Sequence, residues 1–266
     1  MSGEPILLTE TRGMVRWLTI NRPGQMNQVV WDLFPLMIEA LASAQADAAI
    51  RAIVITGAGD RFFCGGGDLS ADLERSARGL APDWLNHPIT RLFAAVEACQ
   101  LPVIARVNGH ALAPGLSLLA MVDLAVTVER ASFGLPEARV GLINTLGLAY
   151  LQRLMPPRKL LELMLTAETI TAAEALTHGL VNYVVPAAEL DAKIDWLVAR
   201  LLDKSPESSR RNKSAFKAMQ DMTLAQALAF GNAAVSTALL TEDFRVGMEA
   251  FNQRRPAQWP TRKTES

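Results

Sequence analysis

Residues 52–69 read AIVITGAGDRFFCGGGDL and contain the clearest indication of the architecture. Residues 52–56 are all apolar or β-branched, which is typical of a strand buried on both faces. Gly57 ends that strand, and the three glycines at 65–67 allow a backbone to approach a ligand closely and to turn its N–H groups outward. The stretch therefore predicts a buried strand followed by either a ligand-binding loop or a flexible surface turn.

Comparable strands and helices alternate on both sides of this stretch. Strands are expected at 15–20, 103–107, 124–128 and 181–185, and helices at 30–41, 89–99 and 114–121. Continuous apolar strands separated by helices predict an α/β fold with much parallel pairing. Two capping boxes, Thr171–Glu174 and Thr223–Gln226, each mark the start of a further helix.

After Pro186 the spacing of the apolar residues is helical almost to the end of the chain. A helical tail of roughly 60 residues is too thin to enclose its own core. Residues 1–200 are therefore expected to form the core domain. Residues 201–266 are expected to form a helical region that packs on that domain and on other subunits.

Charge and hydropathy exclude several kinds of partner. The charges of the 26 Lys and Arg residues nearly cancel those of the 27 Asp and Glu residues. The net charge therefore predicts no general electrostatic attraction to nucleic acid or to an anionic membrane. The mean hydropathy of +0.17 is high for a monomer and favours a homo-oligomer that buries apolar surface between subunits.

The two cysteines, Cys64 and Cys99, are too few for a disulfide framework or a cysteine-rich metal site. The first residues lack the basic and then apolar pattern of a signal peptide, and no apolar run approaches the ~20 residues of a membrane span. These features predict a cytoplasmic protein with no membrane segment.

Three familiar kinds of site fail on the residues present. A dinucleotide fingerprint needs a third glycine where Phe62 stands, and a nucleophile elbow around Ser117 lacks its second glycine. The three histidines have no carboxylate or cysteine at ligand spacing, so no metal site is expected.

Two segments remain as candidates for chemistry. Residues 107–121 predict a strand, a tight turn and the start of a helix, where unpaired N–H groups favour negative charge. Glu137 stands in a small and apolar stretch. One interpretation is a solvated loop charge that pairs with Arg139. The other is a partly buried carboxylate with a raised pKa that can move protons near neutral pH.

Five motifs then occur in the order and spacing of one family. They are NRP at 21–23, ITG and FCGGGDL between 55 and 69, VNGHAL at 107–112, FGLPE at 133–137, and GLVN with VVP between 179 and 186. From about residue 7 onward the chain resembles the crotonase family of enoyl-CoA hydratases and isomerases. The resemblance implies a spiral of ββα units with a C-terminal helical trimerisation region, assembled as trimers or dimers of trimers. It also implies an acyl-CoA substrate, with no cofactor beyond its coenzyme A moiety.

The resemblance implies roles for the residues at the reacting end. Crotonases stabilise an enolate oxygen with two backbone N–H groups, which match Gly67 and Pro114 here. Pro114 has no N–H, so the second donor is Gly115, a water or absent. The two glutamates of hydratases match Ser117 and Glu137.

A glycine that seats the water in hydratases matches Thr145. Family isomerases often keep only the glutamate that matches Glu137, so the resemblance implies proton transfer by one glutamate, leading to double-bond isomerisation or hydration. Two rival interpretations remain: a catalytically weak CoA-thioester binder, and a thioesterase or C–C hydrolase on the same fold.

The resemblance also implies where coenzyme A binds. Gln25, Met26 and Gln28 match backbone contacts to the nucleotide. Gly65 matches a position near the adenine, Gly66 is a further expected substrate-binding residue, and Asp68 and Leu69 line the pantetheine turn. The candidate phosphate partners are Arg22, Arg61, Arg254 and Arg255. The stretch 70–88 and the C-terminal tail are expected to line the acyl pocket.

Overall fold

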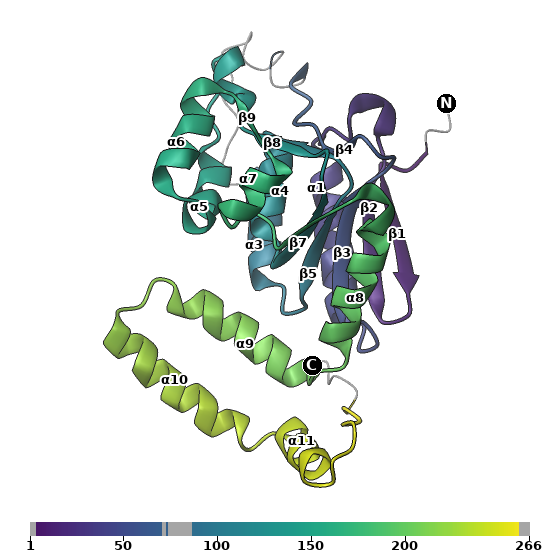
Figure 1. The fold of residues 1–266 in the computed structure, drawn as a ribbon, viewed down its shortest axis with the longest axis vertical. Helices are drawn as coiled ribbons and strands as arrows, with labels where there is room; N and C mark the ends of the chain where they lie inside the picture. The colour runs from purple at the N-terminus through teal and green to yellow at the C-terminus, as the bar shows by residue number, and fades with distance from the viewer. Residues whose placement is uncertain (1–3, 71–72, 74–86, 261–266) are drawn as a thin grey trace.

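The computed structural model describes residues 4–70, 73 and 87–260 of the chain, which form two sheets, flanking helices and a helical arm (Figure 1). The larger sheet has the strand order β1-β2-β3-β5-β7-β10. Its strands are β1 Leu7–Arg12, β2 Val15–Ile20, β3 Ala52–Gly57, β5 Val103–Val107, β7 Leu124–Val128 and β10 Tyr183–Val185. The crossovers place helices on both faces of this sheet, as the alternation in the sequence predicted.

Pairing in the larger sheet is mostly parallel. Strands β2, β3, β5, β7 and β10 pair in parallel, and only β1 is antiparallel to its neighbour. All six residues of β3 are buried, which confirms the strand expected there. Strand β10 starts two residues later than predicted. The Asn182 side chain accepts a hydrogen bond from the N–H of Ala125 at 2.8 Å just before β10 begins.

A second, four-stranded sheet has the order β4-β6-β8-β9. Its strands are β4 Phe62–Cys64, β6 His110–Leu112, β8 Ser132–Gly134 and β9 Thr169–Thr171. Each strand has only three residues. Such strands are too short to show a period of two, so the sequence did not predict this sheet.

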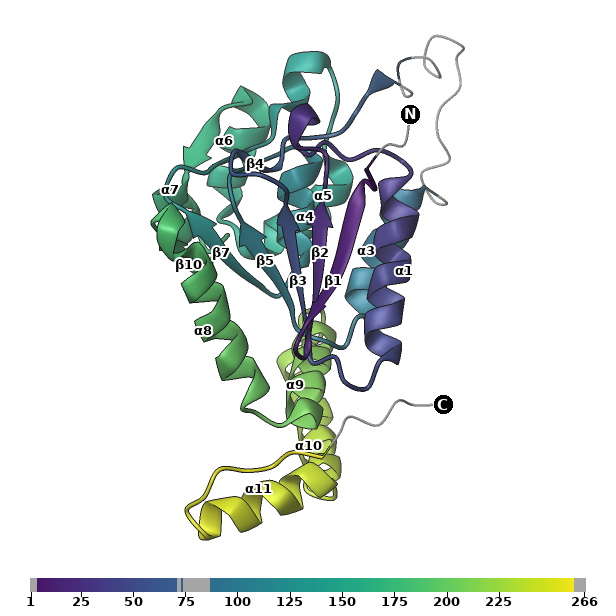
Figure 2. The ribbon, with the colours of Figure 1, turned by 90° about the vertical axis from the view of Figure 1, so that its right-hand side faces the viewer.

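Helices cover both faces of the larger sheet. Helices α1 Leu33–Ala46 and α3 Pro88–Ala98 lie side by side on one face, and α8 Leu190–Leu202 lies on the other (Figure 2). The other core helices are α4 Pro114–Met121, α5 Thr145–Leu154, α6 Pro157–Thr166 and α7 Ala172–Thr177. Short 3-10 helices are η1 Pro23–Gln25, η2 Pro136–Val140 and η3 Ala187–Glu189. Both hydrogen bonds of the predicted capping box at Thr171 are present.

The C-terminal arm projects away from the two sheets (Figures 1 and 2). It consists of α9 Pro206–Met219, α10 Leu224–Ala238 and α11 Glu242–Asn252. The boundary expected after residue 200 falls in the last turn of α8. The predicted capping box at Thr223 is formed, and α10 has no buried residue in one copy of the chain.

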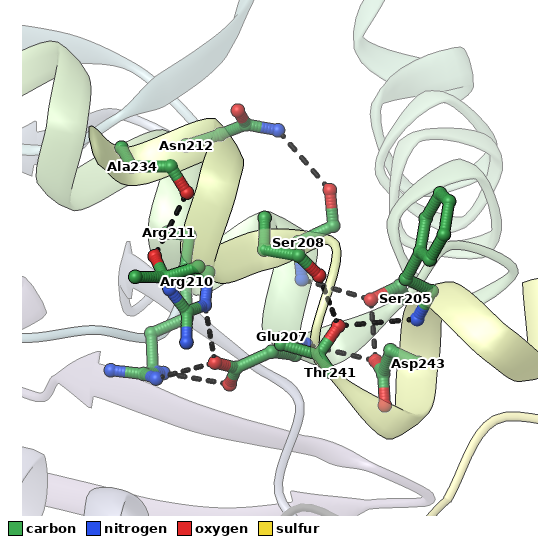
Figure 3. A network of polar contacts seen from close by, with 12 residues as sticks. Ser205, Glu207, Ser208, Arg210, Arg211, Asn212, Ala234, Thr241 and Asp243 are labelled. Carbon is green, nitrogen blue, oxygen red and sulfur yellow. Dashed lines mark hydrogen bonds and ion pairs between the residues drawn. The ribbon is translucent and has the colours of Figure 1, made fainter. Parts of the chain in front are cut away.

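A polar network holds the two ends of this arm together (Figure 3). The Ser205 hydroxyl donates a hydrogen bond to Asp243, and the N–H of Glu207 donates to the same carboxylate at 3.2 Å. Glu207 pairs in turn with Arg210 at 2.7 Å and Arg211 at 2.6 Å. The network fixes the start of α9 against the start of α11.

Within the described residues, no helix alone is both long and apolar enough to cross a membrane. The adjacent helices α10 and α11 meet those two criteria only as a pair, and they are bent by 72° relative to one another.

Candidate active site

The glycine run after β4 packs against the start of α4. The N–H of Asp68 donates to the carbonyl of Val29 at 2.9 Å, and this bridge holds Gly67 in place. A Cβ built on Gly67 would lie 3.6 Å from Cγ of Pro114. Within the described part of the chain the Gly67 N–H donates to no acceptor, so it is available to a ligand.

Helix α4 begins at Pro114, which has no N–H, so it cannot be a donor. The next N–H belongs to Gly115, and among the described residues it also has no acceptor. Gly115 must be glycine, because a Cβ there would lie 2.2 Å from the carbonyl oxygen of Cys64. Before the proline, Ala113 has φ +52° and ψ −125°, a conformation that costs a residue with a side chain ~1–3 kcal/mol. The structure therefore brings Gly67 next to the N-terminus of α4, where the N–H of Gly115 is the first one without an acceptor among the described residues.

Glu137 lies on η2, directly after β8. The N–H of Ala113 donates to the carbonyl of Gly134 at 2.9 Å, so the turn into α4 and the turn into η2 leave neighbouring strands. Arg139 does not pair with Glu137: its guanidinium donates to the carbonyl of Ala167 at 2.8 Å and lies 3.4 Å from Glu168. The interpretation of Glu137 as the partner of Arg139 is therefore wrong.

The two carboxylate oxygens of Glu137 have different surroundings. Oε1 accepts a hydrogen bond of 2.6 Å from the side-chain amide of Asn144. Oε2 is buried and, in the part of the chain that the structure describes, has no hydrogen-bond donor. Burial raises the pKa of Glu137, and hydrogen bonds from its own backbone and from Asn144 oppose that rise. Glu137 is thus a partly buried carboxylate that is suited to proton transfer.

Ser117 and Asn144 complete this cluster. Ser117 is buried on α4, and its hydroxyl donates to Oδ1 of Asn144 at 3.2 Å. Asn144 caps α5 by accepting a hydrogen bond from the N–H of Gly147 at 3.0 Å. Asn144 was not among the residues expected at the site, although an asparagine before a helix is a common N-cap. Thr145, which was expected at the site, is exposed on the first turn of α5.

The expected nucleotide-binding loop lies against the glycine run. The N–H of Gly65 donates to the carbonyl of Met26 at 2.8 Å. The buried Asn27, which was not among the expected site residues, shapes this loop: its amide donates to the carbonyls of Ala58 and Phe62 at 2.9 and 2.7 Å. Gln25 and Gln28 flank Met26 and Asn27 in the sequence. Met26 and Asn27 both have positive φ values.

The four candidate arginines lie in different surroundings. The Arg22 guanidinium donates to the carbonyl of Gln28 at 2.9 Å and lies 3.6 Å from Asp68, so it braces the loop. Arg61 is exposed, with its guanidinium 5.8 Å from the centre of the Phe62 ring.

Arg254 and Arg255 follow α11, at the opposite end of the molecule from β4 (Figure 1). Neither of them is therefore near Gly67 of the same chain.

The expected acyl-pocket stretch at 70–88 lies largely outside the described residues, as do the last six residues of the tail. Leu69, at its border, is described and is 40% exposed. No group of three His, Cys, Asp or Glu residues that could hold a metal ion occurs in the described ranges.

A family model for enoyl-CoA hydratase/isomerase matches residues 10–262. The chain belongs to the enoyl-CoA hydratase/isomerase family. Its similarity to members of the family extends over nearly the whole length: it is 32% identical to the crotonyl-CoA hydratase of Syntrophomonas wolfei, covering 97% of this chain and 99% of that protein. It is also 32% identical to the carnitinyl-CoA dehydratase of Salmonella typhi, covering 98% and 100%.

Solved structures of the family share the fold. An enoyl-CoA hydratase from Polaromonas superposes with a TM-score of 0.89 at 28% identity, covering 96% of this chain and 99% of that one. An enoyl-CoA hydratase from Bacillus anthracis superposes with a TM-score of 0.87 at 28% identity, covering 98% and 100%. The crotonase-type fold expected from the sequence motifs is confirmed.

Proposed function

We infer that this family member moves a proton on the acyl chain of an acyl-CoA thioester, next to the thioester carbonyl. One observation carries the inference: the partly buried Glu137 carboxylate has one oxygen that no group of the described chain occupies. The unoccupied N–H groups of Gly67 and Gly115 support it, because they lie on adjacent elements.

In the proposed reaction Glu137 removes a proton from carbon. The C–H bond breaks, an O–H bond forms on Glu137, and the electron pair moves to the thioester oxygen as an enolate. The Gly67 N–H stabilises that oxygen, and one such donor is worth ~2.7–4 kcal/mol in turnover. Glu137 then returns the proton to a different carbon, and the double bond has moved.

Water addition is the second candidate reaction. It is favoured by the names of the similar proteins, a crotonyl-CoA hydratase and a carnitinyl-CoA dehydratase. Serine at position 117 argues against a two-carboxylate mechanism, because a hydroxyl cannot take a proton from water at neutral pH. Hydration would need Glu137 to act first as base toward water and then as acid toward carbon.

The substrate is expected to be the only small-molecule partner, and the chain is proposed to work as a homo-oligomer, a trimer or a dimer of trimers, in the cytoplasm. Exposed apolar residues on the arm support the oligomer: Phe216, Leu224, Leu228, Val235, Leu240 and Phe251. The two buried, unpaired cysteines are consistent with a reducing compartment.

A panel of short enoyl-CoA substrates in D2O separates the possible reactions. Deuterium uptake without a hydroxyl group indicates isomerisation, and a 3-hydroxyacyl product indicates hydration. Release of free CoA would favour a thioesterase or C–C hydrolase instead. No change with any substrate would favour a binding protein.

The substitution Glu137→Gln tests the assigned acid/base. Turnover is expected to fall by ~100-fold or more, because the amide cannot accept the proton. The affinity for a non-reacting acyl-CoA, measured by calorimetry, is expected to change little. Near-normal turnover in this variant would rule out Glu137 as the acid/base.

A further inference from the structure

We propose that Asn144 and Ser117 are positioning residues that hold Glu137 so that Oε2 is the oxygen that exchanges the proton. The proposal rests on the proposed function of Glu137 as acid/base. It is carried by three polar groups in series that join α4, α5 and η2: the Ser117 hydroxyl, the Asn144 side-chain amide and the Glu137 carboxylate.

The orientation of the Asn144 amide follows from its neighbours. Oδ1 faces two donors, the N–H of Gly147 at 3.0 Å and the Ser117 hydroxyl at 3.2 Å. The amide nitrogen then faces Glu137 Oε1 at 2.6 Å, where an acceptor is required. A flipped amide would place its nitrogen against two donors and its oxygen against a carboxylate, so only one orientation satisfies all the partners.

The same arrangement leaves the two oxygens of Glu137 with different tasks. Oε1 is occupied by the amide of Asn144, whereas Oε2 is buried and has no donor within the described chain. A charge on a buried carboxylate oxygen without a donor costs free energy, and protonation removes that charge. Oε2 is therefore the oxygen that takes the proton from the substrate carbon and returns it.

Ser117 acts through Asn144. Its side chain is buried, and its hydroxyl proton is already donated to the Asn144 carbonyl oxygen. The packing around it is tight: a Cβ on Gly147 would lie 2.0 Å from Ser117 Oγ and 2.4 Å from Asn144 Oδ1. Only glycine at 147 lets the three groups meet, so a serine that stands where hydratases have a glutamate serves here to fix the amide.

Among the described residues, burial and hydrogen bonds determine the shift in the pKa of Glu137, and no charged side chain contributes to it. Arg139, on η2 itself, pairs with Glu168. On α6, which packs against η2, Lys159 pairs with Glu162 at 2.8 Å. The hydrogen bond from Asn144 is thus the side-chain interaction that stabilises the ionised form of Glu137.

Three variants of the full-length protein test the proposal. Asn144→Asp keeps an oxygen for Gly147 and Ser117 but cannot donate to Glu137 and adds a like charge. Asn144→Ser keeps a helix cap but is too short to reach Glu137. Ser117→Ala removes only the hydroxyl bond to the amide. Thr171→Ala, which removes the N-cap of α7 instead, is the matched control.

We expect kcat to fall by about 10-fold or more in both Asn144 variants and by less in Ser117→Ala, with KM nearly unchanged, because positioning is lost and binding is not. The acid limb of the pH profile should move to higher pH. Thr171→Ala should lower only the melting temperature. The proposal would be overturned if the Asn144 variants had a lower melting temperature but the same kcat and the same pH profile as the unsubstituted protein.

A second readout does not depend on turnover. The pKa of Glu137 can be followed by NMR with ¹³C-labelled glutamate, its signal identified by Glu137→Gln. It should rise by about one pH unit in Asn144→Asp and by a smaller amount in Ser117→Ala. An unchanged pKa in both variants would refute the positioning role, even if Glu137→Gln is inactive. Normal turnover in Glu137→Gln alongside a shifted pKa would refute the proposed function, and with it the proton transfer at Oε2, but not the effect of Asn144 on the pKa of Glu137.

Discussion

Glu137 is a partly buried group that can ionise. Because burial disfavours the charged form, the free energy of unfolding of the protein should depend on pH through this residue. The unfolded chain has a glutamate pKa of ~4.3. In the folded chain burial raises the pKa, so the fold favours the protonated form. Each rise in pH through the interval between these two pKa values therefore lowers the free energy of unfolding, and that loss remains at neutral pH.

The substitution Glu137→Gln removes this dependence while keeping an oxygen for the amide of Asn144. We expect the melting temperature of the variant, relative to the unsubstituted protein, to be higher at pH 8 than at pH 4, because only the unsubstituted protein must bury a charge. Calorimetry at both pH values measures this difference. The exposed Glu168, substituted by glutamine, is the control. A difference for Glu137→Gln that stays the same at both pH values would show that its carboxyl group titrates alike in the folded and unfolded chains.

At the scale of the element, α4 supplies the second side of the site through its N-terminus. The helix starts with a residue that has no N–H, directly after Ala113 in a strained conformation. Its dipole still favours negative charge by ~0.3–1 kcal/mol. A direct hydrogen bond to an enolate from the first helical residue is impossible, so the proposed reaction would depend on the N–H of Gly115 or on Gly67 alone.

The substitution Pro114→Gly distinguishes these two cases. If a donor is missing, turnover should rise by ~10-fold or more when the N–H is restored, since one oxyanion donor contributes ~2.7–4 kcal/mol. If Gly115 already serves, turnover should stay constant or fall, because the fixed φ of proline holds the turn. Single-turnover kinetics give the rate of the chemical step in both proteins. A structure with bound acyl-CoA whose thioester oxygen lies far from both Gly67 and Gly115 would contradict both cases.

At the scale of the whole molecule, one copy of the chain leaves an apolar face of α10 exposed. Leu224, Leu228 and Val235 lie on one face of α10, and each of them is more than half exposed. The network of Ser205, Glu207 and Asp243 keeps the arm in a fixed shape, which suits a surface that pairs with other subunits.

We expect light scattering to detect trimers or hexamers at micromolar concentration. The double substitution Leu228→Lys and Val235→Lys should shift the population toward monomers, because two charges would be buried in an apolar interface. Ser236→Lys, on the exposed polar side of α10, is the comparison. A monomeric unsubstituted protein would contradict the assembly expected here.

Local sequence determined the parts of this protein that depend on near neighbours. The run at 52–56, the capping box at Thr171 and the helix starting at Pro114 are all present as expected, because apolar periodicity and helix caps act over a few residues. The five motifs also sufficed to indicate the family. The three-residue strands of the second sheet escaped prediction, since they show no period and are stabilised only by pairing with distant strands.

Only the tertiary structure decided which residues of the site contact one another. Ser117 and Asn144 are 27 residues apart, and Asn27 and Ala58 are 31 apart. No periodic pattern relates such pairs, because they meet only when the turns after β6 and β8, or the loops around β4, are brought together by strand pairing. Whether Glu137 was a solvated charge or a buried base depended on that packing, since burial and the Asn144 amide are properties of the folded chain.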